Sequence, residues 1–482
     1  MPQTLHIFKK DIRYLRADIA VILALMALFA YTDSHWSPAN DPPHFVFNQT
    51  TELLRILLPI SWLYLITRLV HAEPLVGNRQ FWLTRPYQWT SLLSAKALFT
   101  ITIISVPKAI TDAIIVTVQD LPLSQYLPGF LCRELLIAVV MLLPLAALAS
   151  VTAGITQVAI VVFVFVGGSI GISEVLMNNP SHVNLDWGDL EWIRSMIGGI
   201  SMSGSAFIVV LLQYRYRRTA VSRATGIAAL LLAMVSIPWM LGFAIQSRLS
   251  KVPIGDDVRI TLDSTRQPRA GRTRSGSGGF LIPVAIAGIP DGAEIRDDRV
   301  EMAASGIVNR LRDASVIHEP DGYWIEIPVE GPVDHPAEGP VSVRASLFLT
   351  MFGNAHATTI PVGGSPSAVP EIGNCFMQSP RLGVSPRFYV TFCASAFRWP
   401  RRLISVHVDG ATSDFRDRPY SPLPADVGIS PVTSWATQVV VWGARPQSAP
   451  VTPPARAATI TVEEPLAHFH REFIANIPGW SR

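Results

Sequence analysis

Three residues near the end of the chain are the nearest match in this sequence to a metal-binding motif. His468 and His470 would share one face of a strand, and Glu472 follows them. The three form only a loose cluster, because no further ligand stands at a spacing typical of zinc sites. The sequence also has no Gly-x-Ser-x-Gly elbow, no His-Glu-x-x-His run and no Gly-x-x-x-x-Gly-Lys-Ser/Thr loop for ATP. We therefore expect no catalytic site, metal or cofactor on this chain.

A pair of cysteines offers redox chemistry. Cys375 and Cys393 each lie inside an apparent strand of the second half of the chain, whereas Cys132 opens an apolar stretch. If the second half faces an oxidising compartment, the pair could form a disulfide. The alternative is two buried free thiols, and the residue pattern leaves both interpretations open.

Lys108 and Asp112 are charged residues within an otherwise apolar segment. They are four residues apart, so on a helix they share a face and could neutralise each other. Inside a membrane, such a pair would mark a transport pathway. The alternative, which the sequence favours, places both residues at the outer membrane interface.

The first half of the chain has the composition of membrane helices. The mean hydropathy of the whole chain is +0.33 and charged residues make up 16%, against roughly 25% in soluble domains. Strong apolar signals lie at 135–173, at 195–214 and at 224–247. The first is long enough for two helices of about 20 residues, joined by a tight turn near Thr152, Ala153 and Gly154. Weaker spans at Ile19–Thr32, Leu53–Val70 and Leu92–Val116 bring the prediction to seven.

The basic residues set the orientation of these spans. With the N-terminus inside, most of them fall on the cytoplasmic side, as membrane proteins prefer; they are Lys9, Lys10, Arg13, Arg16, Arg68, Arg79, Arg85, Arg215, Arg217, Arg218 and Arg223. The short outer loops hold Arg194 and several acids. We therefore expect a multi-pass protein of the cytoplasmic (inner) membrane, with a cytoplasmic N-terminus and an extracytoplasmic C-terminal domain.

The first residues of the chain have an amphipathic helical pattern. Phe8, Ile12, Leu15 and Ile19 recur at helical spacing, and the basic residues among them fall on another face. This pattern is typical of a helix that lies in the cytoplasmic interface and faces anionic lipid headgroups. A plain extension of the first span is the alternative.

The loop between the second and third spans has the composition of a docking element. Phe81, Trp82 and Leu83 form an apolar knob, which Arg79 and Arg85 flank. Pro86 follows Arg85 in the sequence. We expect this proline to end a short helix and to turn the chain back toward the membrane. An exposed aromatic knob requires a cover. A partner protein could provide it, and so could neighbouring spans or lipid headgroups.

This loop resembles the corresponding loop in permease subunits of ABC-2 type transporters. The shared order is an acid and a glycine, an apolar-Thr-x-Pro turn and a later lysine, here Glu73, Gly77, Pro86 and Lys96. The N-terminal helix, the hairpin of spans four and five, the outer segment before span six and the basic end of span six are also similar. The resemblance covers about residues 1–220. The usual architecture of that family has six spans and an inner C-terminus, from which this chain departs by a seventh span and an exported region.

The resemblance implies partners for this chain. A separate ATP-binding cassette subunit, which carries ATP and Mg, would dock on the loop residues Glu73, Gly77, Arg79, Phe81, Trp82, Leu83, Arg85 and Pro86. The membrane subunit would act as a homodimer or with a related permease. No basic patch with interleaved aromatic residues suggests nucleic acid as a partner.

The second half predicts an all-β region. Val341, Val343, Ala345, Leu347 and Leu349 alternate with polar residues, and Pro and Gly separate several such segments, which is typical of β-sandwich modules. We expect an α-helical membrane bundle followed by this extracytoplasmic region. The expected divisions are an interfacial helix at 1–18, a six-helix domain at 19–220, a seventh span at 221–249 and two β-rich modules at 250–362 and 363–482.

Two functions fit these expectations. The first is a permease subunit that moves a substrate, in the export direction, with ATP hydrolysed by a separate subunit. The alternative is a membrane-anchored extracytoplasmic binding or interaction protein without transport activity. Seven spans exceed what an anchor requires, so the sequence favours the permease.

Overall fold

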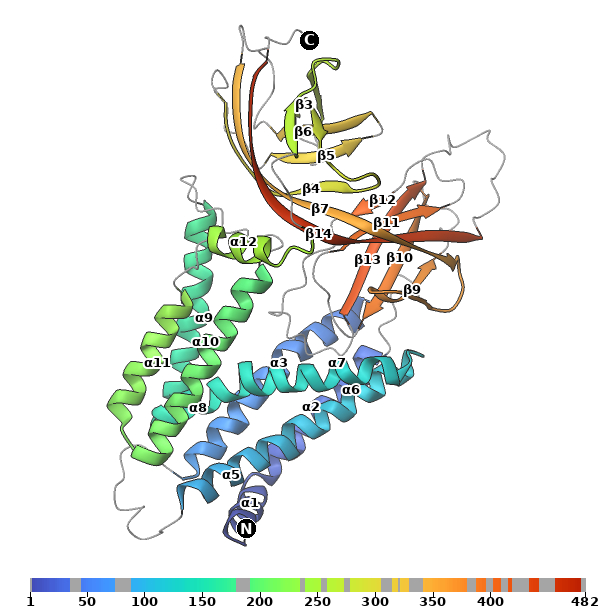
Figure 1. Cartoon of the computed structure of the whole chain (residues 1–482). Helices are drawn as coiled ribbons and strands as arrows, with labels where there is room; N and C mark the ends of the chain where they lie inside the picture. Colours follow the sequence, from blue (N-terminus) through green and yellow to red (C-terminus); the bar gives the residue numbers. More distant parts are fainter. Residues whose placement is uncertain are drawn as a thin grey trace.

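The chain forms a helical half and a β half that lie at opposite ends of the molecule (Figure 1). The computed structural model describes residues 2–34, 45–73, 88–178, 191–234, 239–252, 258–272, 278–304, 314–319, 321–328, 341–378, 387–395, 402–408, 415–417, 433–441 and 456–477. All statements below concern these residues.

Five of the described helical segments are long and apolar enough to cross a membrane, namely Arg16–Ser34, Thr50–His71, Trp89–Val118, Leu123–Val151 and Met196–Tyr216. The chain is therefore a multi-pass membrane protein. The helices are α1 (Pro2–Tyr14), α2 (Arg16–Ser34), α3 (Phe45–His71), α5 (Trp89–Thr100), α6 (Val106–Val118), α7 (Leu123–Leu136), α8 (Leu143–Val151), α9 (Ile155–Asn178), α10 (Glu191–Leu211), α11 (Thr219–Met234) and α12 (Trp239–Arg248). The turn between α8 and α9 lies where the sequence places it.

Two of the long segments contain a wider helical turn at the same distance from a proline. α5 continues into α6 through the π-helical segment Ile101–Ser105, and α7 continues into α8 through Ile137–Leu142. Pro107 and Pro144 are the second residues of α6 and α8. A proline has no N–H and its ring clashes with the carbonyl four residues earlier, which here lies inside the wider turn. The π-helical turn therefore accommodates the proline without ending the helix.

The structure describes two helices within the predicted seventh span, and residues 235–238 lie outside the described part. α11 ends at Met234 and α12 begins at Trp239. α12 packs against the β half, where Phe243 meets Phe348 edge-on with ring centroids 5.0 Å apart. The last part of the uncharged run at 224–247 thus lies in a helix that contacts the β half.

Three antiparallel sheets form the described part of the β half. Their strand orders are β1-β3-β6-β5 with β2 beside β3, β13-β10-β9-β8, and β12-β11-β14-β7-β4. The strands are β1 (Arg259–Leu262), β2 (Arg269–Arg272), β3 (Gly278–Ala287), β4 (Glu294–Ala304), β5 (Ser315–Glu319), β6 (Gly322–Pro328), β7 (Val341–Pro361), β8 (Ser367–Val369), β9 (Gly373–Gln378), β10 (Arg387–Ser395), β11 (Leu403–Val408), β12 (Phe415–Asp417), β13 (Thr433–Val441) and β14 (Ala457–Ile477).

The long strands β7 and β14 belong to both cores of the β half. The first half of β7 and the second half of β14 bury apolar residues against β3 and β6, whereas Ile360 and Ile460 from their other halves pack with Val406 of β11. The two strands pair from Val341 opposite Ile477 to Pro361 opposite Ala457. The two β modules therefore share strands, and the expected division at residue 363 does not follow the pairing.

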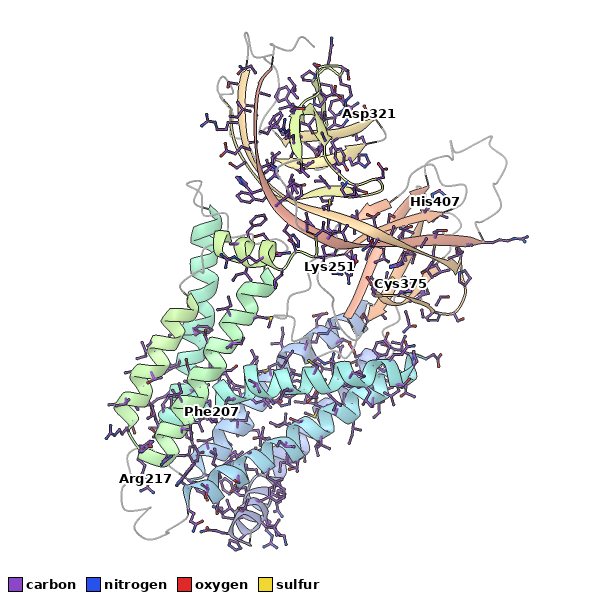
Figure 2. The ribbon with its side chains drawn as sticks, viewed as in Figure 1. Phe207, Arg217, Lys251, Asp321, Cys375 and His407 are labelled. Atoms are coloured by element: carbon purple, nitrogen blue, oxygen red, sulfur yellow. A yellow bond between two sulfur atoms is a disulfide. The ribbon has the colours of Figure 1, made fainter. Side chains whose placement is uncertain are left out.

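The junction between the two halves is anchored at an irregularity in β14. The register of β14 against β7 shifts between Pro465 and Ala467, and a bulge leaves backbone groups outside the ladder. The carbonyl of Leu466 accepts hydrogen bonds from the backbone N–H groups of Lys251 (2.9 Å) and Val252 (3.1 Å). The Lys251 side chain also pairs with Glu464, and Figure 2 shows this lysine where the chain leaves α12. The linker is thus fixed to the sheet immediately after α12.

Candidate functional site

The docking loop predicted from the sequence begins at a buried ionic cluster. Glu73 is buried, and its Oε1 accepts a 2.5 Å hydrogen bond from Lys10 Nζ. Its Oε2 lies 3.3 Å from Lys96 Nζ, which donates to Asp11 Oδ2 at 2.8 Å. The four side chains come from α1, from the end of α3 and from α5. We call Lys10, Asp11, Glu73 and Lys96 the loop-base cluster.

The loop-base cluster is neutral in total but strongly desolvated. Asp11 and Glu73 are almost fully buried and Lys96 is buried, whereas Lys10 lies at the rim with its side chain 34% exposed. Burial raises the pKa of Asp11 above its ordinary value, and the neighbouring Lys96 opposes this shift. Carboxylates in such a position persist as ions only when cations pair with them. Lys96, which contacts both acids, is therefore central to the cluster.

A layer of apolar packing surrounds the loop-base cluster. Ile7 of α1 and Leu92 and Ala95 of α5 share one buried core with Tyr214 at the end of α10. Arg215 lies over the ring of Trp89, 5.9 Å from its centroid, and Trp89 is the first residue of α5. Both sides of the loop are thus held, at Glu73 before it and at Trp89 and Lys96 after it.

The structure places the predicted docking residues unequally. Glu73 lies in the loop-base cluster, where it faces the protein interior. The remaining predicted docking residues, Gly77, Arg79, Phe81, Trp82, Leu83, Arg85 and Pro86, lie outside the described residues. The sequence did not predict the role of Asp11. A signal for it exists, because Asp11 is four residues from both Ile7 and Leu15 and thus lies on the buried face of α1.

A second buried ionic cluster lies between α6 and α7. Lys108 and Asp112 form the predicted pair, Lys108 Nζ to Asp112 Oδ1, and both are buried. Arg133 of α7 donates from Nη2 to Asp112 Oδ2 at 3.1 Å, and Glu134 lies beside them, also buried. We call these four residues the hairpin cluster. Lys108 and Asp112 lie on the buried face of α6, which packs in the helix hairpin. Ile110 and Ile114 lie on the exposed face of the same helix.

The sequence analysis missed Arg133 and Glu134 because it began the fourth span after Glu134. In the structure α7 begins at Leu123 and carries Pro128 and Gly129 in its interior. Both residue types disfavour helix interiors, which hid the first part of this span. Leu123, Leu127, Leu131 and Leu135 recur every four residues and are all exposed, and this period is a sequence signal for an apolar helix surface that begins before Glu134.

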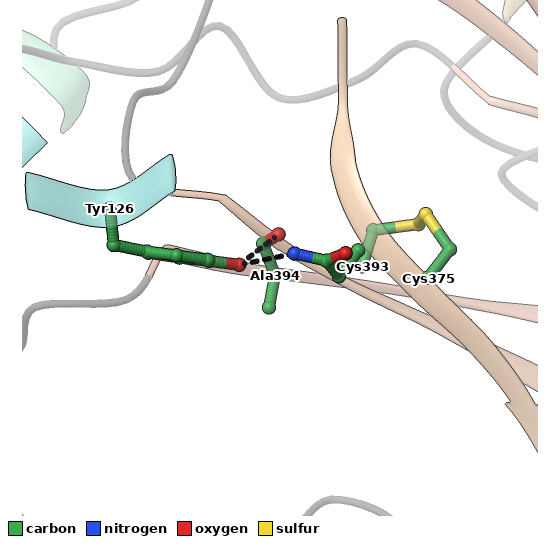
Figure 3. Close-up of a disulfide and its surroundings, with 5 residues drawn as sticks. Tyr126, Cys375, Cys393 and Ala394 are labelled. Carbon is green, nitrogen blue, oxygen red and sulfur yellow. Dashed lines mark hydrogen bonds between the residues drawn. A yellow bond between two sulfur atoms is a disulfide. The ribbon is translucent and has the colours of Figure 1, made fainter. Parts of the chain in front are cut away.

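The N-terminal part of α7 is attached to the β half beside the cysteine pair. Cys375 of β9 and Cys393 of β10 lie directly opposite each other and are joined by a disulfide. Tyr126 donates a hydrogen bond of 2.9 Å to the Ala394 carbonyl, and Asn374 Nδ2 donates to the Tyr126 hydroxyl at 3.2 Å (Figure 3). Asn374 and Ala394 are the sequence neighbours of the two cysteines, so the disulfide joins the strands that hold Tyr126.

A cavity of about 660 Å³ lies at this attachment. Its lining includes Gln125 and Tyr126 from α7, and Glu371 and Arg402 from the β half, whose side chains form an ion pair of 3.0 Å. The histidines of the predicted loose cluster lie elsewhere. His468 contacts Gln246 and Thr350, and within the described part of the chain no three His, Cys, Asp or Glu side chains come together as a metal site.

No protein-family model, no curated protein and no solved structure matches this chain.

Proposed function

We propose that this chain is the membrane-spanning permease subunit of an ABC transporter. It moves a substrate across the cytoplasmic membrane, in the export direction, with ATP hydrolysed by a separate subunit. The observation that carries the proposal is the loop-base cluster. It ties the two sides of the predicted docking loop to each other and to α1 through charged side chains that are costly to separate.

The loop-base cluster provides a path for mechanical coupling. A partner that pulls or pushes the loop acts on Glu73 and on the start of α5. Glu73 is held by Lys96 of α5 and by Lys10 of α1, so force on the loop moves these helices together. α5 continues through its π-helical turn into α6, which carries the movement toward the hairpin cluster. A loop that served only to connect two anchoring spans would have no need of such buried charges.

The β half is attached in a way that also favours transport over anchoring. It contacts α7 through Tyr126 and α12 through Phe243 and the linker at Lys251. These contacts bridge the outer end of the hairpin and the region after α11, so helix movements at the outer surface would change the β half. We infer that this half is extracytoplasmic, that it consists of two β-sandwich-like modules sharing β7 and β14, and that it receives or guides the exported substrate.

The remaining features of the proposal follow from the sequence. Seven spans, with the last at 221–249, place the N-terminus inside and the β half outside, in agreement with the basic residues of the inner loops. A homodimer, or a dimer with a related permease, would place two helical bundles around one pathway. The ATP and Mg belong to the partner ATPase.

The experiment that tests this proposal is a pull-down of the ATPase with loop variants. Phe81→Ala with Trp82→Ala removes the aromatic knob, and each interface aromatic contributes about 2 kcal/mol. The loss of both should weaken binding roughly a thousandfold, while the amount of protein in the membrane stays nearly unchanged. Pro86→Ala should have a smaller effect, because it only loosens the turn.

Phe207→Ala is the matched control, since it also removes an aromatic ring. Phe207 is 53% exposed on α10 and lies in the helical half (Figure 2), outside the predicted docking loop. This variant should recover as much ATPase per mole of membrane subunit as the unmodified chain. Full recovery with the loop double variant would reject the knob as the dock. Loss of the double variant from the membrane would show that the two rings pack against the spans.

A further inference from the structure

Glu134 of the hairpin cluster is a buried acid whose carboxylate has no hydrogen-bond partner in the part of the chain that the structure describes. Only 9% of this residue is exposed, and neither carboxylate oxygen has a hydrogen-bond partner among the described residues. An ionised carboxylate without hydrogen bonds in an apolar environment is costly by several kcal/mol. The protonated carboxyl group avoids most of that cost, because it carries no charge.

The neighbouring cations are already engaged elsewhere. The charged groups near Glu134 are Lys108 and Asp112 on α6 and Arg133 on its own helix. Asp112 takes both cations, with Lys108 at Oδ1 and Arg133 at Oδ2. Two acids and two bases are thus present, but one acid holds both bases. Among the described residues, neither cation donates a hydrogen bond to Glu134.

Glu134 belongs to the candidate membrane span Leu123–Val151. Leu131 and Leu135, on either side of it in sequence, are each 63% exposed and form the outer face of α7. Glu134 lies eleven residues after Leu123, the start of α7, which corresponds to about 16 Å along the helix. Ionisable residues inside membrane spans are rare and serve pathways for ions or protons.

We propose that Glu134 is a proton-binding site within the membrane domain. In the arrangement described, its carboxyl group holds a proton at neutral pH. A movement between α6 and α7 that transfers Arg133 from Asp112 to Glu134 replaces the proton by a cation, and one O–H bond breaks as the proton leaves for water. The site therefore couples the position of the hairpin to proton uptake and release. This chemistry uses residues of this chain alone and goes beyond its pairing with an ATPase.

Infrared spectroscopy of the full chain in lipid nanodiscs tests this site without requiring a reagent to reach it. At about pH 7 exposed carboxyl groups are ionised, so a carboxylic C=O stretching band reports buried neutral acids. The unmodified chain should show such a band, which should shift in D2O because the group carries an exchangeable proton. Glu134→Gln should lose it. Gln has the shape of a protonated Glu, so this variant should keep the fold.

Two further variants complete the test. Glu134→Asp keeps a carboxyl group and should retain a neutral-acid band, shifted in position. Glu52→Gln removes an exposed acid of α3 that pairs with Arg55 and should leave the band unchanged. Absence of the band in the unmodified chain at about pH 7, or its full retention in Glu134→Gln, would overturn the proposal. Should Glu134→Gln fail to fold, the band of Glu134→Asp decides, and an unshifted or absent band contradicts the assignment.

Discussion

Replacement of Lys96 by methionine is the sharpest perturbation of the loop-base cluster. Lys96 Nζ lies 2.8 Å from Asp11 Oδ2 and 3.3 Å from Glu73 Oε2. Methionine preserves most of the apolar packing but removes the charge, so two buried carboxylates share Lys10 as their cation within the cluster. Removal of one partner of a buried ion pair costs about 3 to 5 kcal/mol. Because Lys10 already contacts Glu73, we expect a loss near the lower end, about 3 kcal/mol.

The assay is the free energy of unfolding in mixed micelles titrated with denaturing detergent. Lys10→Met is the matched control, because its side chain is partly exposed and such pairs contribute about 1 kcal/mol or less. The triple variant Lys96→Met, Asp11→Asn and Glu73→Gln removes the orphaned charges and should regain most of the lost stability. If Lys96→Met costs no more than Lys10→Met, the inference that buried charges hold the loop base is wrong.

Three further predictions concern topology, the disulfide and acid stability. A reporter fused after Arg218 should report the cytoplasm and one fused after Arg248 the outside; the same side for both would remove α11 as a span. Thiols of Cys375 and Cys393 in the unfolded chain should react only after reduction, and replacement of both by serine should cost about 3 kcal/mol, given a separation of 18 residues; labelling without reductant would reject the disulfide in the cell. Hydrogen bonds from Thr265, first its hydroxyl and then its backbone N–H, together with Arg266, lower the pKa of Asp263 to about 2. A depressed folded-state pKa adds stability above the ordinary value of about 4 that is lost as pH falls toward 2, so the unfolding temperature should fall over this range, and should fall less in Asp263→Asn.

The sequence predicts much of the membrane half because lipid imposes strong rules on it. Apolar runs of about 20 residues and the asymmetry of basic residues are enough to place the main helices and the turn at Thr152. The prediction weakens where residue types oppose the structure. Pro128 and Gly129 hid the N-terminal part of α7.

Long-range pairing explains what the sequence could not predict. The alternation in β7 predicts the buried face that includes Val343, Leu347 and Leu349, yet nothing local shows that β14, about a hundred residues later, pairs along its whole length. The loop-base cluster has the same character, because Asp11 and Lys96 are far apart in the chain. Glu73 was predicted as a docking residue, and its burial indicates that it positions the loop from inside.

The central claim, that this chain works with an ATP-binding cassette ATPase, is tested most directly by native mass spectrometry. The chain is purified from its own membranes in mild detergent, and the intact assembly is weighed and then dissociated into subunits. We predict an assembly in which an ATP-binding cassette subunit is present in equal number with the membrane subunits, which are this chain or this chain and a related permease. An assembly that contains this chain, as a monomer or oligomer, without any such ATPase would contradict the account and favour a membrane-anchored binding protein.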